Sequence, residues 1–175
     1  EIVETEMISL NYTSGTTAQP KGVMFTHRTT FSFVFEWSLM EPAYQHGVRM
    51  IFVLSLGGAP GILWALLHML THGATLYLET GFEPRNTLRR LVDERIEVMM
   101  GVPVLFEQIA ALDEFADADL SALKATTVGG ARVPLPTLEA WLAKGIALRQ
   151  IYGMTELGGS SIGNSRQHAA ARPES

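Results

Sequence analysis

Residues 12–23 read Tyr-Thr-Ser-Gly-Thr-Thr-Ala-Gln-Pro-Lys-Gly-Val, and this stretch governs the interpretation of the chain. It places four aliphatic hydroxyls, two glycines and a lysine in one turn. Backbone N–H groups, hydroxyls and an ammonium, without bulky side chains between them, suit a chain of phosphates. The loop is not of the Walker type, because Pro20 and Gly22 flank Lys21 where that motif needs Gly before the Lys and Ser or Thr after it. A Thr-rich surface turn is the alternative, and the spacing disfavours it.

A second segment, residues 151–156, reads Ile-Tyr-Gly-Met-Thr-Glu. It ends in the carboxylate of Glu156, a hard oxygen ligand that suits Mg²⁺, and a polyphosphate normally arrives with that metal. Together the two segments indicate nucleotide chemistry. The alternative for Glu156 is structural: it would cap the turn at Gly158 and Gly159 or pair with a surface arginine.

Hydrophobic periodicity predicts an α/β fold. Apolar, β-prone runs alternate with helical patterns, which argues for a mostly parallel sheet flanked by helices, with a hairpin-like phosphate loop. In such sheets ligands bind beyond the carboxyl ends of the strands, where residues 55–58, 129–131 and 152–156 are expected. Strands are expected over residues 7–12, 23–26, 49–56, 74–78, 96–100, 125–128 and 147–151, and helices over 28–40, 62–71, 84–94, 104–112 and 135–143.

Composition bounds the class of protein. The chain has 175 residues, a length that suits one domain, and a net charge of −5, which gives no basic footprint for nucleic acid. Zero cysteines exclude disulfides and thiolate catalysis. The longest apolar stretch, residues 57–70, is broken by Pro60 and His68, so no transmembrane segment is expected. Both ends look cut, and residues 169–175 carry no folding signal.

With both segments in view, the chain resembles the adenylate-forming (AMP-binding) superfamily of acyl- and aryl-CoA synthetases, peptide-synthetase adenylation domains and firefly luciferase. Residues 12–23 match the family phosphate loop Tyr-Thr-Ser-Gly-Thr-Thr-Gly-x-Pro-Lys-Gly-Val except at Ala18, and residues 152–156 match Tyr-Gly-x-Thr-Glu. The short segment 129–131 looks like the glycine segment beside the adenine and acyl pockets. The resemblance implies that residues 1–175 are one partial AMP-binding domain, the centre of the large N-terminal domain, without the C-terminal lysine domain.

The same resemblance implies roles for individual residues. Lys21, Thr155 and Glu156 would be catalytic, with Thr155 at the α-phosphate of ATP and Glu156 on Mg²⁺. The nucleotide-binding residues would be Thr13, Ser14, Gly15, Thr16, Thr17, Lys21 and Gly22 around the phosphates, Gly129, Gly130, Ala131 and Tyr152 around the adenine, and Gly153, Met154 and Thr155 beside them.

The expected activity is that of an AMP-forming acyl-CoA synthetase using ATP, Mg²⁺ and CoA. Thr16-Thr17 and Gln150 look more like acyl-CoA synthetases than peptide synthetases, and a fatty or otherwise hydrophobic acid is the expected substrate. The alternatives are an aryl-acid or peptide-synthetase adenylation domain, or a non-catalytic nucleotide-binding remnant. The resemblance also favours a cytoplasmic location, free or peripheral to a membrane. The piece alone is expected to be inactive and to self-associate through uncovered apolar faces.

Some features depart from the family or stand outside it. Ala18 replaces a glycine, which puts the mobility of the phosphate loop in question. Residues 54–61 replace the Pro-x-Phe-His segment that guards the acyl tunnel, so either the pocket is more open or Gly57 and Gly58 form a turn that starts a helix. His68 and His72 share a helical spacing, for which a partly exposed helix end is favoured over a metal site. Phe31, Phe33, Phe35 and Trp37 are expected to pack in the core or against missing neighbours.

Overall fold

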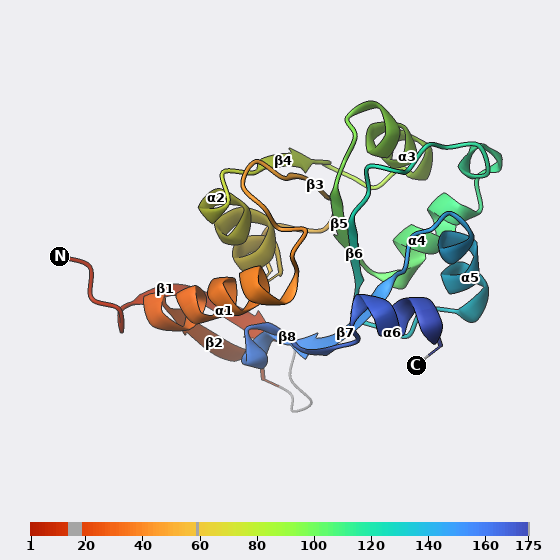
Figure 1. Cartoon of the computed structure of the whole chain (residues 1–175). Coiled ribbons are helices and arrows are strands. Elements are labelled where there is room, and N and C mark those ends of the chain that lie inside the picture. Colours follow the sequence, from red (N-terminus) through yellow and green to blue (C-terminus); the bar gives the residue numbers. More distant parts are fainter. Residues whose placement is uncertain (14–18, 59, 175) are drawn as a thin grey trace.

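The computed structural model describes residues 1–13, 19–58 and 60–174, which form two sheets (Figure 1). The six-stranded sheet has the order β4-β3-β5-β6-β7-β8, and strands β1 and β2 form a separate antiparallel pair. In the large sheet, β3 to β7 run parallel and β8 pairs antiparallel with β7. The predicted mostly parallel sheet is therefore confirmed. The strands of the large sheet are β3 Arg49–Phe52, β4 Thr75–Leu78, β5 Val98–Gly101, β6 Ala125–Val128, β7 Arg149–Met154 and β8 Gly159–Gly163.

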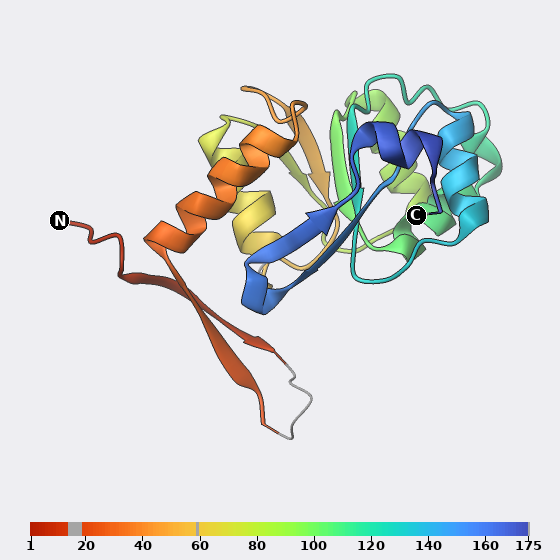
Figure 2. The same ribbon diagram turned by 60° about the horizontal axis from the view of Figure 1, so that its bottom comes forward.

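Helices cover both faces of this sheet (Figure 2). One face carries α1 (His27–Met40), the π-helix η1 (Pro60–His68) and α2 (Met69–Thr71). The other carries α3 (Pro84–Asp93), α4 (Pro103–Ala110) and α5 (Leu135–Ala143). The remaining helices are the 3₁₀ turns η2 (Asp113–Phe115) and η3 (Thr155–Leu157), and α6 (Arg166–Ala171).

Alternate residues of the central strands supply two hydrophobic cores. Met50 and Phe52 of β3 pack with α1 and η1, whereas Ile51 between them packs with α3, α4 and α5. All three are fully buried. This two-residue alternation under helices on both sides explains why β3 reads as an unbroken apolar run.

The helix starts follow local capping chemistry. Thr26 caps α1: its Oγ1 accepts from the Thr29 N–H at 3.2 Å, and the Thr29 hydroxyl accepts from the Thr26 N–H at 2.9 Å. This reciprocal capping box satisfies two donors that the first turn leaves free. Glu83 caps α3 by accepting from the Asn86 N–H at 2.7 Å, with Pro84 in the first turn.

The β1–β2 hairpin extends from the body of the molecule and leads directly into α1 (Figure 2). Strand β1 spans Met7–Thr13 and β2 spans Lys21–Thr26, with Thr13 opposite Lys21. The predicted second strand, which began at residue 23, therefore starts two residues earlier. Lys21 therefore belongs to β2 and not to the loop, and its backbone is held by the pairing with Thr13.

Two further expectations are wrong. Strand β3 ends at Phe52 instead of residue 56, because the chain turns: the Ser55 hydroxyl accepts from the Gly57 N–H at 3.1 Å, and η1 starts at Pro60. Residues 169–175, expected to lack structure, include the end of α6. That helix starts at Arg166 and is capped by Ser165, whose hydroxyl accepts from the His168 N–H at 3.1 Å, and it buries Ala169.

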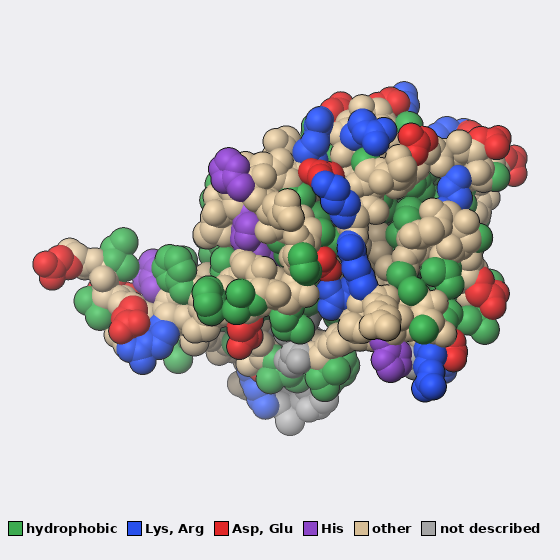
Figure 3. Space-filling view, in the orientation of Figure 1, with side chains coloured by type: hydrophobic (Ala, Val, Ile, Leu, Met, Phe, Trp, Pro, Cys, Tyr) green, Lys and Arg blue, Asp and Glu red, His purple; other side chains and the backbone are tan. Residues whose placement is uncertain are grey.

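The aromatic side chains of α1 divide between two environments. Phe33 and Trp37 are buried, whereas Phe31 and Phe35 are each 65% exposed and Leu39 is 68% exposed. Hydrophobic side chains lie over α1 in the space-filling view (Figure 3). Self-association through this face stays a prediction. In the described residues, no helix combines the length and apolarity needed to cross a membrane.

His68 is fully buried, so the expectation of a partly exposed helix end is wrong for this residue. Its ring packs edge-on to Tyr44 with a centroid distance of 4.6 Å, and its Nε2 lies 3.4 Å from the Ser38 hydroxyl. Among the described residues no three His, Asp or Glu side chains group as metal ligands.

Burial of His68 makes the stability of the fold depend on pH. Desolvation, with the nearby His72 as a smaller cause, lowers the pKa of His68 from 6.5 to about 4. The unfolded chain therefore takes up a proton at His68 before the folded chain does. Stability is fully present above about pH 6.5 and falls by about 3 kcal/mol as the pH drops to about 4.

This prediction is checked by urea unfolding between pH 7 and pH 4. His68→Asn is expected to flatten the dependence of unfolding free energy on pH, and His168→Asn, on the exposed surface of α6, serves as the control. Equal slopes for the wild type and His68→Asn would contradict it.

Candidate functional site

The two sequence segments meet in space. The hydroxyl of Thr13, at the end of β1, donates to Oε1 of Glu156 at 3.2 Å, although 143 positions separate them in the chain. Glu156 lies on η3, the turn that follows β7. The carboxylate expected to hold Mg²⁺ thus stands at the entry to the loop expected to hold phosphates.

Backbone geometry, not the Glu156 side chain, closes the turn after η3. The Gly158 N–H donates to the Thr155 carbonyl at 3.0 Å, and Gly158 has φ of +75°, a conformation that favours glycine. A Cβ there would stand 3.7 Å from Phe33, so the turn lies close to α1. This arrangement leaves the Glu156 carboxylate exposed beside Thr13. The Gly158 N–H is thus bonded to a backbone carbonyl, and the Glu156 carboxylate accepts from Thr13.

The phosphate segment is described only at its two ends. Thr13 ends β1, and Lys21 and Gly22, both exposed, begin β2. The expected phosphate residues Ser14, Gly15, Thr16 and Thr17, and the departure at Ala18, lie outside the described residues. Because Thr13 pairs with Lys21 across the hairpin, the two ends of the segment are adjacent.

A second group of predicted residues lines one hollow of about 800 Å³, here called the β6–β7 hollow. Gly130 and Ala131 follow β6, and Tyr152 and Gly153 lie on β7. Gly129 brings the two strands close together, since a Cβ at this position would lie 2.9 Å from Ile151 Cγ1. The structure therefore unites the glycine segment with the tyrosine that was expected beside it.

Some placements on β7 differ from expectation. Tyr152 and Met154 were expected beyond the carboxyl end of the last strand but lie within β7, because β8 pairs with them and extends it. Tyr152 is 63% exposed and Met154 44% exposed, while Thr155 follows on η3 and is half-buried. The exposed face of Tyr152 is available for stacking on a ring.

The β6–β7 hollow also contains residues that were not predicted to belong to the site. They are Gln150, Asn164 and His168. Gln150 joins two segments of the rim: its Oε1 accepts from the Val133 N–H at 3.2 Å, and its Nε2 donates to the Pro173 carbonyl at 3.0 Å. His168 went unnoticed because α6 itself was not expected.

A third feature is a cavity of about 550 Å³ between α1 and the β7–β8 hairpin, here called the α1 cavity. Phe25, Phe33, Trp37 and Leu63 supply apolar walls, and Glu156 reaches its rim. The lining also includes polar and charged side chains of α1, among them Arg28 and Glu36, and a largely apolar cavity with a few polar groups is the usual form of a small-molecule site. Its position suits a molecule with a polar head near Glu156 and an apolar body along α1.

The donor set at Glu156 fits magnesium. Mg²⁺ usually binds proteins through one or two carboxylates, with phosphate oxygens and water completing its octahedron. One exposed carboxylate beside the segment that is expected to bind phosphates meets this description. The absence of a group of three His, Asp or Glu side chains among the described residues is compatible with it.

Comparison with known proteins assigns the chain to a family. The AMP-binding enzyme family model matches residues 1–175, so this chain belongs to the AMP-binding enzyme family. Feruloyl-CoA synthase of an Amycolatopsis species is 35% identical over 164 residues, which cover 93% of this chain and 33% of that protein. Long-chain-fatty-acid–CoA ligase FadD13 of Mycobacterium tuberculosis H37Rv is 29% identical over 153 residues, covering 86% of this chain and 30% of that protein.

A solved structure agrees with the fold. The inhibitor-bound N-terminal domain of FACL13 from Mycobacterium tuberculosis superposes with a TM-score of 0.86 at 26% identity, covering 93% of this chain and 40% of that one. This chain spans about a third of the length of the two curated relatives described above.

Proposed function

We propose that the protein is an AMP-forming acid–CoA ligase that activates a hydrophobic carboxylic acid with ATP. The observation that carries this proposal is the hydrogen bond from Thr13 to Glu156, which joins the phosphate segment to the carboxylate. Family membership over residues 1–175 and the names of the relatives, a feruloyl-CoA synthase and a long-chain-fatty-acid–CoA ligase, support it.

Different groups of the predicted site residues bind different parts of the ATP molecule in this proposal. Lys21 and Thr13, together with Ser14, Gly15, Thr16, Thr17 and Gly22, hold the β- and γ-phosphates. The β6–β7 hollow takes the adenine, with Tyr152 against the ring and Gly129–Ala131 allowing close approach. Thr155 contacts the α-phosphate, and Glu156 holds the metal. Mg²⁺, when bound, neutralises charge on the departing phosphates.

The reaction proceeds in two balanced steps. A carboxylate oxygen of the acid bonds to the α-phosphorus of ATP, and the bond from that phosphorus to the bridging oxygen breaks, which releases pyrophosphate. The thiolate of CoA then attacks the acyl carbonyl, and AMP leaves. The first step needs no general base, because the carboxylate is already a nucleophile. The contribution of this chain is fixed positive and hydrogen-bonding groups around the phosphates.

The acid occupies the α1 cavity. Phe25, Phe33, Trp37 and Leu63 offer an apolar lining, while the mouth lies near Glu156 and therefore near the reacting phosphate. The names of the relatives, a feruloyl-CoA synthase and a long-chain-fatty-acid–CoA ligase, favour a hydrophobic acid and a CoA ligase over a peptide-synthetase adenylation domain.

The proposal is tested by ATP–pyrophosphate exchange with the full-length protein and a panel of acids. Exchange with hydroxycinnamic or fatty acids, followed by acyl-CoA formation when CoA is added, is the expected result. Exchange with amino acids alone would replace the proposal by the peptide-synthetase alternative. No exchange with any acid, together with intact ATP binding, would favour the non-catalytic remnant. The 175-residue piece, assayed in parallel, is expected to be inactive.

A double substitution tests the phosphate segment. Lys21→Ala with Thr16→Ala is expected to weaken ATP binding roughly tenfold to 100-fold, since each removes a hydrogen-bonding group that serves the phosphates. Lys21 is exposed at the start of β2, so its loss is expected to change unfolding free energy by less than about 0.5 kcal/mol.

Calorimetric ATP titration and urea unfolding of the double variant check both halves of this expectation. Lys124→Ala, on the loop before β6, controls for the loss of a positive charge in the ATP titration only, because Lys124 pairs with Glu97 and its loss is expected to affect unfolding. Unchanged ATP affinity in the double variant would remove these residues from the phosphate site.

A further inference from the structure

An ion pair between Arg149 and Glu41 lies in the interior of the molecule. Arg149 Nη1 donates to Glu41 Oε2 at 2.5 Å, and the side chains are only 6% and 1% exposed. Arg149 is the first residue of β7, and Glu41 directly follows the last residue of α1. The pair therefore links two elements 108 positions apart in the chain.

Arg149 and Glu41 each make further hydrogen bonds, Arg149 to the residue that follows β8 and Glu41 to residues at or just after the end of α1. The Nε of Arg149 donates to the carbonyl of Asn164 at 2.9 Å, at the residue where the chain leaves β8. One carboxylate oxygen of Glu41 accepts from the Ala43 N–H at 3.2 Å, and the Glu41 N–H donates to the Trp37 carbonyl at 3.1 Å. The guanidinium and carboxylate thus connect the base of the β7–β8 hairpin to the last turn of α1.

These two elements are the walls of the α1 cavity. Trp37 of α1 and Gly163 of β8 both line it. Trp37 is hydrogen-bonded to Glu41, and Gly163 is the residue before Asn164. Any change in the length of the Glu41–Arg149 contact would move one wall relative to the other.

Stability alone does not account for such a pair. Removing two charges from water costs about as much as their attraction returns, and apolar residues of similar volume often replace buried pairs without loss of stability. What an apolar pair does not reproduce is the directional spacing of a guanidinium that bonds two acceptors at once.

We propose that Glu41 and Arg149 are positioning residues that fix the separation of α1 from the β7–β8 hairpin and, through it, the width of the α1 cavity. The effect on acid selectivity rests on the proposed function, but the separation itself does not. Neither residue touches the reacting groups in this scheme.

The separation is measured with spin labels in the full-length protein. These 175 residues contain no cysteine, so Leu39→Cys on α1 and Arg166→Cys just after Asn164 introduce two exposed labelling sites, after replacement of any cysteine elsewhere in the protein. Pulsed electron–electron double resonance between the two spin labels is expected to give a narrow distance distribution in the wild type. Glu41→Leu with Arg149→Met is expected to shift its mean or broaden it, while Arg85→Gln with Glu114→Gln, an exposed ion pair elsewhere, leaves it unchanged.

Acid selectivity supplies the second measurement. In pyrophosphate exchange, the Glu41→Leu/Arg149→Met variant is expected to change the preference between acids of different length about tenfold, the range that one or two methylenes are worth in a pocket. A uniform loss of activity would indicate a general folding defect and contradict positioning.

Arg149→Lys keeps the charge opposite Glu41 but loses the second donor to Asn164, and it serves if the double variant does not fold. It is expected to change the distance distribution in the same direction. A wild-type distribution in both folded variants, or in Arg149→Lys where only that variant folds, would overturn the proposal. Absence of acid-dependent exchange in the wild type would defeat the proposed function and leave the distance measurement to decide the positioning role.

Discussion

Replacing Glu156 with glutamine is expected to lower the rate of acid-dependent pyrophosphate exchange by about 100-fold to 1,000-fold. Glutamine has the same size and still accepts a hydrogen bond from Thr13, which lies 3.2 Å away in the wild type. Only the charge that attracts the metal is lost, so the departing phosphates are less neutralised. Binding of the acid is expected to change little, because the walls of the α1 cavity stay in place.

The measurement is the Mg²⁺ dependence of exchange in the wild type and in Glu156→Gln. The variant is expected to need a higher Mg²⁺ concentration as well as to turn over more slowly. Glu139→Gln, on the exposed side of α5, controls for the general effect of removing one negative charge. A Mg²⁺ requirement and rate equal to those of the wild type would show that Glu156 is not a metal ligand.

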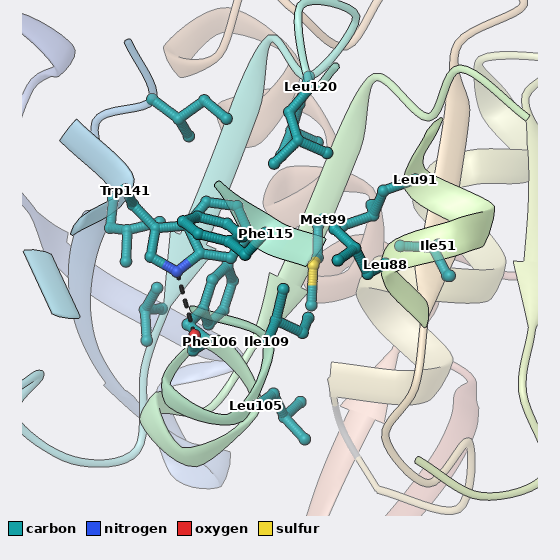
Figure 4. Close-up of a cluster of buried hydrophobic side chains, with 14 of the residues drawn as sticks. Ile51, Leu88, Leu91, Met99, Leu105, Phe106, Ile109, Phe115, Leu120 and Trp141 are labelled. Carbon is teal, nitrogen blue, oxygen red and sulfur yellow. Dashed lines mark hydrogen bonds between the residues drawn. The ribbon is translucent and has the colours of Figure 1, made fainter. Parts of the chain in front are cut away.

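Replacing Trp141 with alanine is expected to lower the free energy of unfolding by about 3–5 kcal/mol. Trp141, on α5, is fully buried between Phe106 and Phe115, with ring centroids 5.3 Å and 5.0 Å away (Figure 4). Its indole Nε1 donates to the Phe106 carbonyl at 3.1 Å. Alanine would leave a large cavity and also remove the only donor that this indole provides.

Urea unfolding measures this loss, with two comparison variants. Trp141→Phe keeps much of the volume but not the N–H, so it is expected to cost less than alanine and to reveal the share of the hydrogen bond. Leu135→Ala, at an exposed position of the same helix, is expected to cost under about 1 kcal/mol. A loss below about 1 kcal/mol for Trp141→Ala would mean that the core around α5 collapses around the vacancy.

The sequence predicted the large sheet well, because periodicity is a local signal. Met50, Ile51 and Phe52 form an apolar run, and a strand buried on both faces needs one. Predictions were weaker where long-range pairing decides the structure. Strand β8 and the extension of β7 over Tyr152 form only because the two segments pair, and residues 159–163 carry little β-propensity of their own.

The candidate site was predicted by motif, and its geometry was not. The segments at 12–23 and 151–156 identified Thr13 and Glu156, but nothing local indicated that they form a hydrogen bond. The Glu41–Arg149 pair was missed altogether, because a charged residue following a helix and another at a strand start each look like surface residues in sequence. Whether a charged side chain is buried depends on the assembled fold, and it can be recognised only when the oppositely charged residue that pairs with it is known.

Because β3 to β7 run parallel, their carboxyl ends all lie on one side of the sheet and their amino ends on the other, and these two sides differ in their tolerance to sequence change. Thr155, Glu156 and the glycine segment 129–131 all follow carboxyl ends of strands, whereas the loop between α4 and β6 enters a strand at the opposite edge. Insertions near residues 116–122 would therefore lengthen a connection without displacing a proposed ligand contact. New substrate preferences are free to evolve at one edge while sequence drift at the other leaves the chemistry unaltered.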